Sequence, residues 1–249
     1  MIAATDLIRI RGLEERAFNA WPALSSVLSA GWVMRFADGY TKRANSLNAW
    51  MPECPLEAFL PEASALYAHA QLPMIVRLSP LAGPTADDLL EAQGYKRIDE
   101  TVIMTVPLSA ELQIDREVSC SRALDYTWAN GFAAANGVPE AHRTTHDAML
   151  SAIRWPVAFA QLIENGEALA WGLAVSERGK VGLFDIVTRS AARRRGIGRR
   201  LVMSLLAWGQ RQGAHEAYLQ VVATNTPAIH LYRELGFTEA YRYHYRIAP

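Results

Sequence analysis

The sequence has 249 residues, 51% of them hydrophobic, and its 25 Lys and Arg residues balance 25 Asp and Glu residues. This hydrophobic share suits a packed core and argues against disorder, while zero net charge argues against a protein that coats nucleic acid. No uncharged apolar run is long enough to cross a bilayer, so we expect no membrane partner. Cys54 and Cys120 have neither metal-ligand spacing nor a disulfide framework, which favours a reducing cytoplasm and no bound metal.

The first half of the chain alternates helices and strands. We expect a helix over 7–30 interrupted by Pro22, strands over 31–34 and 41–50 around an Asp38–Gly39 turn, a helix over 55–70, a strand over 72–78, a helix over 85–93, and one or two strands within 95–106. Segment 107–115 is polar and lacks periodicity. We therefore predict two domains, over 1–112 and 116–249.

The second half repeats the alternation more fully. We expect a strand over 117–120, helices over 124–135 and 140–153, a meander of strands over 157–163, 169–175 and 180–187, a helix from Gly196 that stops near Gly213, a strand over 217–222, a helix over 227–235, and a strand pair within 237–247. Antiparallel strands followed by strand–helix–strand units predict an α/β fold, in which helices cover both faces of a mixed sheet.

One short segment recurs in both halves. Leu89 to Gly94, followed by Tyr95 and an apolar stretch, aligns with Leu231 to Gly236, followed by Phe237 and another apolar stretch. This echo favours an internal duplication, although a short helix that ends in glycine and an aromatic residue can also arise without one. The first copy lacks an Arg/Gly-rich loop and has Leu90 where the second has Tyr232.

The most informative segment joins the strand over 180–187 to the following helix. It contains the cations Arg193, Arg194, Arg195 and Arg199, together with Gly196, Ile197 and Gly198. Amides at a helix N-terminus lack intrahelical acceptors, and glycine lets a ligand approach them, so this loop predicts a phosphate-binding site. A solvated arginine run is the alternative. A dinucleotide fingerprint would need glycine at Leu201, and a P-loop would need Gly-Lys-Ser/Thr.

Two further groups carry candidate chemistry. Asn225 heads a helical segment that carries Tyr232, whose phenol can donate a proton to a leaving group. His142 and His146 are one helical turn apart but lack a third ligand, so we interpret them as exposed or substrate-lining rather than metal-binding.

The ordered motifs Val-Thr-x4-Arg-x-x-Gly-x-Gly and Asn-x-x-Ala-x-x-Leu-Tyr-x-x-x-Gly-Phe resemble those of the GNAT N-acyltransferases, over about residues 118–247. The resemblance implies a duplicated GNAT fold with a degenerate first domain and a catalytic second domain. It implies that acetyl-CoA is the co-substrate and an amine the acceptor. By this resemblance the amides of Arg194 to Arg199 hold the CoA pyrophosphate, the backbone of Ile186, Val187 and Thr188 pairs with the pantetheine arm, Asn225 and Ala228 contact the arm, and Tyr232 protonates the thiolate.

The family places its general base variably, so the base must be sought in this sequence. Asp185 lies two residues before Val187 and is our candidate, because residues two apart in a strand share a face. Glu216 is a lesser candidate. The alternatives to an acetyltransferase are an acyl-CoA sensor without turnover and an RNA-binding module. The acceptor amine and the oligomeric state stay open.

Overall fold

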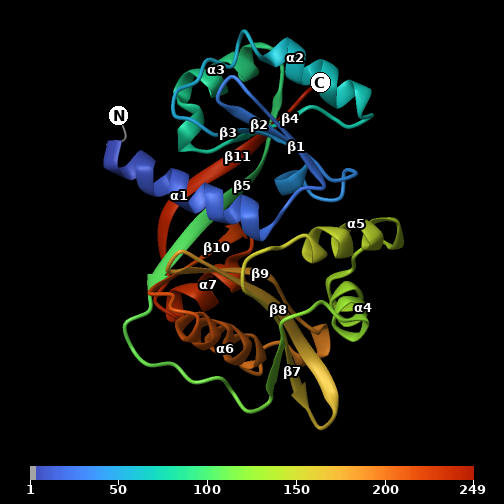
Figure 1. Ribbon diagram of the computed structural model, residues 1–249, viewed down its shortest axis with the longest axis vertical. Helices are drawn as coiled ribbons and strands as arrows, with labels where there is room; N and C mark the ends of the chain where they lie inside the picture. The colour runs from blue at the N-terminus through green and yellow to red at the C-terminus, as the bar shows by residue number, and fades with distance from the viewer. Residues whose placement is uncertain (1–3) are drawn as a thin grey trace. The chain divides into compact units, whose positions relative to one another are not determined.

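The computed structural model describes residues 4–249, so the first three residues of the predicted N-terminal domain lie outside it (Figure 1). The described chain divides into two compact units. The first contains residues up to Ile103 together with Val221–Asn225 and Glu239–Pro249, and the second contains Met104–Gln220 and Thr226–Thr238. Within residues 4–249, no helix combines the length and apolar character that a membrane span requires.

The first unit is a sheet with strand order β1-β2-β3-β4-β11-β5. Its elements are α1 (Ala4–Ala20), β1 (Ser25–Ser29), β2 (Trp32–Phe36), β3 (Leu47–Ala49), α2 (Leu60–His69), β4 (Ile75–Leu78), α3 (Pro84–Ala92), β5 (Lys96–Pro107) up to Ile103, and β11 (Thr238–Ile247) from Glu239. The predicted helix over 7–30 is too long, because α1 stops before Pro22, whose ring cannot continue a helix. Residues after Pro22 form an edge strand instead.

The C-terminal strand does not follow the linear domain boundary that we predicted. The expected strand pair within 237–247 is the single strand β11, which pairs antiparallel with β4 from His244 opposite Leu78 to Ile247 opposite Ile75. These hydrogen bonds place most of β11 in the first unit, although it ends the chain. The boundary is therefore set by sheet pairing rather than by the polar segment 107–115.

The second unit contains the strand order β10-β9-β8-β7-β6. Its elements are β6 (Val118–Ser121), α4 (Tyr126–Asn136), α5 (Glu140–Ser151), β7 (Val157–Glu164), β8 (Glu167–Glu177), β9 (Lys180–Thr188), α6 (Ile197–Arg211), β10 (Glu216–Val222) up to Gln220, and α7 (Thr226–Glu234). β6 to β9 form an antiparallel meander, whereas β10 is parallel to β9. The predicted mixed sheet is confirmed.

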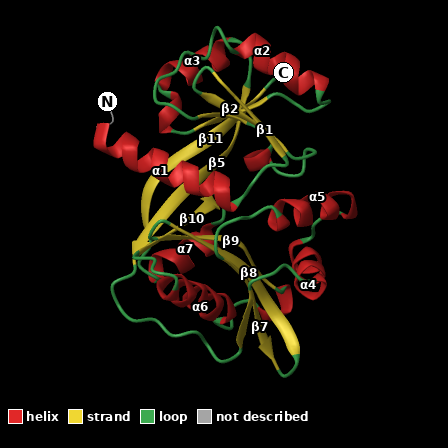
Figure 2. Cartoon of the chain, viewed as in Figure 1, coloured by secondary structure: helices red, strands yellow, loops and turns green. Residues whose placement is uncertain are grey.

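Helices cover both faces of this sheet (Figure 2). A Cβ atom at Gly131 of α4 would lie 2.6 Å from Trp171 Nε1, and one at Gly172 would lie 2.9 Å from Leu205 Cδ1 of α6. Trp171 and Gly172 are consecutive in β8 and so point to opposite faces. α4 and α6 therefore pack on opposite faces, and both glycines are needed for that close packing.

The polar segment over 107–115, predicted as the domain boundary, is hydrogen-bonded to α6. The Gln210 side chain accepts a hydrogen bond from the Leu112 amide at 3.0 Å and donates to the Ala110 carbonyl at 2.7 Å. Farther along, Ser204 Oγ accepts from the Asp115 amide at 3.0 Å. In these hydrogen bonds the backbone of the segment is paired with polar side chains of α6.

The two echoed segments share one helix-ending geometry. Gly94 and Gly236 have φ values of 80° and 87°, and the amides of Tyr95 and Phe237 bond back to Leu90 and Tyr232 at 2.9 and 3.0 Å. Left-handed glycine with this back-bond is a common helix ending. The geometry is therefore compatible with duplication, which stays a prediction.

Candidate active site

The loop between β9 and α6 has two left-handed residues. Arg194 has φ 60° and Gly196 has φ 75°, and Gly196 is the N-cap of α6 without a side-chain cap hydrogen bond. Such alternation turns successive amides toward one concave face, which is an anion-binding arrangement. In an α-helix that starts at Ile197, the amides of the first turn have no intrahelical acceptor. The loop therefore offers an anion a cluster of backbone donors.

The arginines around this loop differ in whether their side chains already contact acceptors in the protein. Arg195 Nη2 lies 3.2 Å from Glu164 Oε2, and Arg193 Nε donates to the Thr188 carbonyl at 3.3 Å. Neither Arg194 nor Arg199 contacts an acceptor within the described part of the chain, and both are exposed. The positive charge left for an anion is therefore concentrated on Arg194 and Arg199.

Arg200, which follows this group, has a structural role. It contacts Glu164 and donates from Nε to Asp115 Oδ2 at 2.7 Å. The hydrogen bond from Arg200, with those from the Glu117 amide and nearby positive charge, lowers the pKa of Asp115 to about 2. This ion-pair network fixes the start of α6 to the 107–115 segment and to β7.

The hydrogen-bonded pairing of β9 with the parallel strand β10 ends before β9 reaches the arginine-rich loop. Across the described residues the ladder between β9 and β10 extends from Lys180 opposite Glu216 to Leu183 opposite Leu219. On the other side of β9, Trp171 pairs with Val187 while Leu173 pairs with Phe184, so the single residue Gly172 of β8 faces two residues of β9. This is a β-bulge, which bends a strand and ends regular pairing. The backbone of Ile186, Val187 and Thr188 therefore runs without β10 along its free edge.

The bulge contains Asp185. Its φ is 50°, a left-handed conformation that Asp tolerates better than most residues. Simple strand alternation, on which the prediction of its direction rested, does not apply at a bulge. Its Oδ2 lies 2.9 Å from His146 Nε2 of α5, and the Asp185 side chain is 8% exposed. Asp185 therefore lies beside the free edge of β9 as half of a buried His–Asp pair.

His146 corrects the interpretation of the two histidines as exposed or substrate-lining. Its side chain is 1% exposed and stacks on Phe132 of α4, with ring centroids 5.1 Å apart. Burial alone would lower the pKa of His146, but the hydrogen bond to Asp185 and the charges of Asp185 and Asp147 raise it above the usual value. The sequence signal was the proximity of His146 to Asp147; its partner Asp185 is distant in the chain.

Glu216, the lesser candidate base, is in the wrong place. It forms an ion pair with Lys180, opposite which it stands at the start of the parallel ladder. Lys180 and Asp185 are five positions apart, which is roughly 16 Å along a strand. Glu216 is therefore removed from the bulge and from the anion loop.

α7 carries the predicted acid. Tyr232 is buried, its ring centroid is 5.8 Å from that of Phe237, and burial raises its pKa to about 12. A phenol with this pKa keeps its proton at neutral pH. Ala228 is half-buried one turn earlier in α7, and Asn225 is exposed and directly precedes the helix in the chain.

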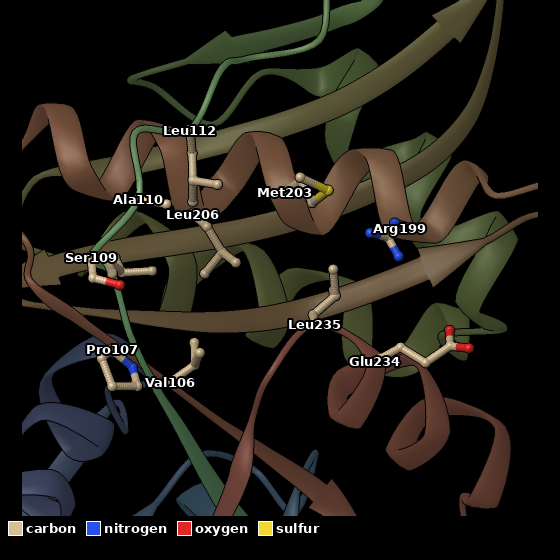
Figure 3. Close-up of a pocket in the computed structure, with 11 residues that line it drawn as sticks. Val106, Pro107, Ser109, Ala110, Leu112, Arg199, Met203, Leu206, Glu234 and Leu235 are labelled. Carbon is tan, nitrogen blue, oxygen red and sulfur yellow. The ribbon is translucent and has the colours of Figure 1, made fainter.

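A pocket of about 250 Å³ lies next to the first turns of α6 (Figure 3). Arg199 and Glu234 lie at one end of it, and Ser109 and Ala110 at the other. The wall between them is mainly apolar and consists of Val106, Pro107, Leu108, Leu112, Met203, Leu206 and Leu235. Arg199 therefore belongs both to the lining of this pocket and to the first turn of α6.

No cluster of three or more His, Cys, Asp or Glu side chains suited to a metal ion occurs between residues 4 and 249.

Comparison with known proteins agrees with this geometry. The family model described as "Probable histone acetyltransferase Rv0428c C-terminal" matches residues 8–246. The uncharacterized N-acetyltransferase YobR of Bacillus subtilis is 28% identical over 246 residues, which cover 96% of this chain and 98% of YobR. The [ribosomal protein bS18]-alanine N-acetyltransferase of Escherichia coli is 35% identical over 80 residues, which cover 32% of this chain and 54% of that protein.

Solved structures show the same fold. A GCN5-related N-acetyltransferase from Kribbella flavida superposes with a TM-score of 0.71 at 15% identity, covering 100% of this chain and 97% of its own. A tandem GNAT protein from the clavulanic acid biosynthesis pathway gives a TM-score of 0.64 at 11% identity, covering 95% and 87%. With a family model that matches nearly the whole chain and an N-acetyltransferase relative of the same length, this protein belongs to the GNAT N-acetyltransferase family and is an acyltransferase.

Proposed function

We propose that this enzyme transfers an acetyl group from acetyl-CoA to an amine, by direct attack in a ternary complex. The observation that carries the proposal is the uncapped start of α6, where Arg194 and Gly196 are left-handed and two exposed arginines have unpaired charge. Backbone donors and local cations together suit a pyrophosphate. Net neutrality of the chain fits such a local anion site better than a polynucleotide surface.

The position of the pyrophosphate at this loop determines where the rest of acetyl-CoA binds. The amides of Arg194 to Arg199 hold the pyrophosphate, and the free edge of β9 at Ile186 to Thr188 pairs with the pantetheine arm, as an added strand would. A backbone amide on this edge donates to the thioester carbonyl as negative charge develops there. Asn225 and Ala228 are assigned to the arm by their place in the family motif.

Proton transfers complete the reaction. Asp185 removes a proton from the ammonium form of the acceptor, and the neutral amine attacks the thioester carbon. The C–S bond then breaks, and Tyr232 donates its proton to the departing sulfur. The attacking nitrogen loses its second proton to water as the amide forms, and the Tyr232 phenolate recovers a proton from water. Since a thiol has a pKa of about 8.5, a phenol of pKa about 12 is the weaker acid. We therefore expect the proton to be shared with sulfur during bond breaking rather than released earlier.

The acceptor is an amine of a small molecule or of a protein. The test measures thiol release from acetyl-CoA with a panel of amines (a polyamine, an aminoglycoside, lysine and N-terminal alanine peptides), and CoA affinity by calorimetry. Tyr232→Phe should lose kcat by about a hundredfold, the lower range for a general acid, with little change in CoA affinity. The matched control is Tyr126→Phe, since Tyr126 is 83% exposed.

Two outcomes would count against the proposal. Absence of measurable CoA binding would remove the phosphate site. CoA binding without thiol release for any amine, in wild type as in Tyr232→Phe, would instead identify a sensor that binds acyl-CoA without turnover.

A further inference from the structure

The second unit contains a buried histidine that the proposed steps leave unused. His146 of α5 lies between two carboxylates, with Nε2 2.9 Å from Asp185 Oδ2 and Nδ1 3.2 Å from Asp147 Oδ1. The Asp147 side chain is 43% exposed, whereas that of Asp185 is 8% exposed. Both ring nitrogens therefore face acceptors, one inside and one near the surface.

The ring of His146 is held in one orientation. Phe132 of α4 stacks on it at an interplanar angle of 17°. The charged groups shown facing it are Asp185 from β9 and Asp147 from α5 itself, and the neutral Phe132 ring of α4 stacks on it. Because a flipped ring would lose both hydrogen bonds, Nε2 stays directed at Asp185.

The buried carboxylate of Asp185 requires a hydrogen-bond donor to stay ionised. A carboxylate placed on a left-handed bulge residue and mostly removed from water is costly to ionise unless a donor compensates it. Within the described chain, His146 is the group found in contact with this carboxylate, and it contacts Oδ2. The other oxygen, Oδ1, is left to accept a proton.

We propose that His146 is a positioning residue that holds Asp185 through Oδ2, so that Oδ1 faces the incoming ammonium group. This inference rests on the proposed function, in which Asp185 is the base. His146 itself does not touch the acceptor and transfers no proton to it. The imidazolium form satisfies both carboxylates at once, which agrees with the raised pKa of His146.

The experiment uses the full chain, acetyl-CoA and the best amine of the panel. The variants are His146→Ala, which removes the donor, and His146→Gln, whose amide can donate to Oδ2 but cannot titrate. His142→Gln is the matched control, one turn earlier on α5 and half-buried. Calorimetry with CoA and the melting temperature report on the phosphate site and on folding.

We expect His146→Ala to lower kcat by about ten- to a hundredfold, the effect of misplacing a catalytic group. CoA affinity should stay within about twofold, and His146→Gln should recover most of the rate. In wild type the Cε1–H resonance of His146 should titrate above that of an ordinary histidine, and Asp185→Asn should lower its pKa.

Three results would overturn the inference. These are a normal kcat in His146→Ala, a His146→Gln variant that folds but is as slow as His146→Ala, and a His146 titration unaffected by Asp185→Asn. Loss of CoA binding in the wild type would instead refute the proposed function. A fully active Asp185→Asn variant would refute the assignment of Asp185 as the base and, with it, this inference, while CoA binding in the wild type would leave the phosphate site standing.

Discussion

The start of α6 gives the sharpest test of the phosphate site, through the substitution Gly196→Ala. Gly196 has φ 75°, and a Cβ added there would meet no atom within 4 Å. The substitution therefore changes backbone preference without creating a steric clash. The left-handed conformation costs a residue with a Cβ about 1 to 2 kcal/mol.

This cost should appear in CoA affinity. Because no neighbour holds the new methyl group, the loop without ligand can relax toward right-handed geometry. CoA binding must then return residue 196 to the left-handed conformation in which the backbone amides are aligned. If the full strain is transferred to binding, Kd rises by about 5- to 30-fold. Calorimetry with CoA at fixed salt measures the change.

Gly213→Ala is the matched control at the other end of the same helix. Gly213 has φ 85° and likewise has no atom within 4 Å of the added Cβ. Gly213→Ala should leave CoA affinity unchanged, whereas Gly196→Ala should weaken CoA binding and, because its free loop relaxes, lose little stability in urea unfolding. Equal CoA affinity in Gly196→Ala and wild type, or equal weakening in both variants, would refute the assignment of the pyrophosphate to this cap.

The remaining predictions concern charge, pH and packing. Arg194→Ala should weaken CoA affinity by about fivefold at low salt, as expected for a charge pair of about 1 kcal/mol in water. Arg195→Ala should weaken it less, because Glu164 already pairs with Arg195. Calorimetry at two salt concentrations measures both effects, and a larger loss of affinity in Arg195→Ala would contradict this reasoning. Because the folded-state pKa of His146 is raised above 6.5, its stabilisation should be complete below that pH and lost as pH rises through the folded-state value. Urea unfolding across this pH range should show the free energy of unfolding falling with pH in wild type but not in His146→Gln. The same pH dependence in both proteins would contradict the prediction. Gly209→Ala places a Cβ 2.6 Å from a β9 side chain. It should therefore lower the free energy of unfolding by about 1 to 3 kcal/mol without changing CoA affinity. A melting temperature equal to that of the wild type would contradict this prediction and show that the contact relaxes.

Sequence alone determined the local parts of the site. The order strand, Arg/Gly loop, helix is a matter of short-range periodicity and of glycine conformation, so β9, the loop and α6 lie where the pattern predicted them. The end of α6 before Gly213 has the same origin. The motif around Tyr232 likewise indicated its helix, since helix periodicity acts over a few residues.

Only the tertiary structure decided which of these residues have partners. Arg193, Arg194, Arg195 and Arg199 look equivalent in sequence, and packing of β7 against the loop pairs one of them with a carboxylate. Strand pairing likewise carries β11 back to β4, which no linear boundary could predict. Finally, a bulge turned Asp185 toward His146, 39 positions earlier. Such pairings depend on how separate elements pack in space, and local preferences of the chain do not contain that information.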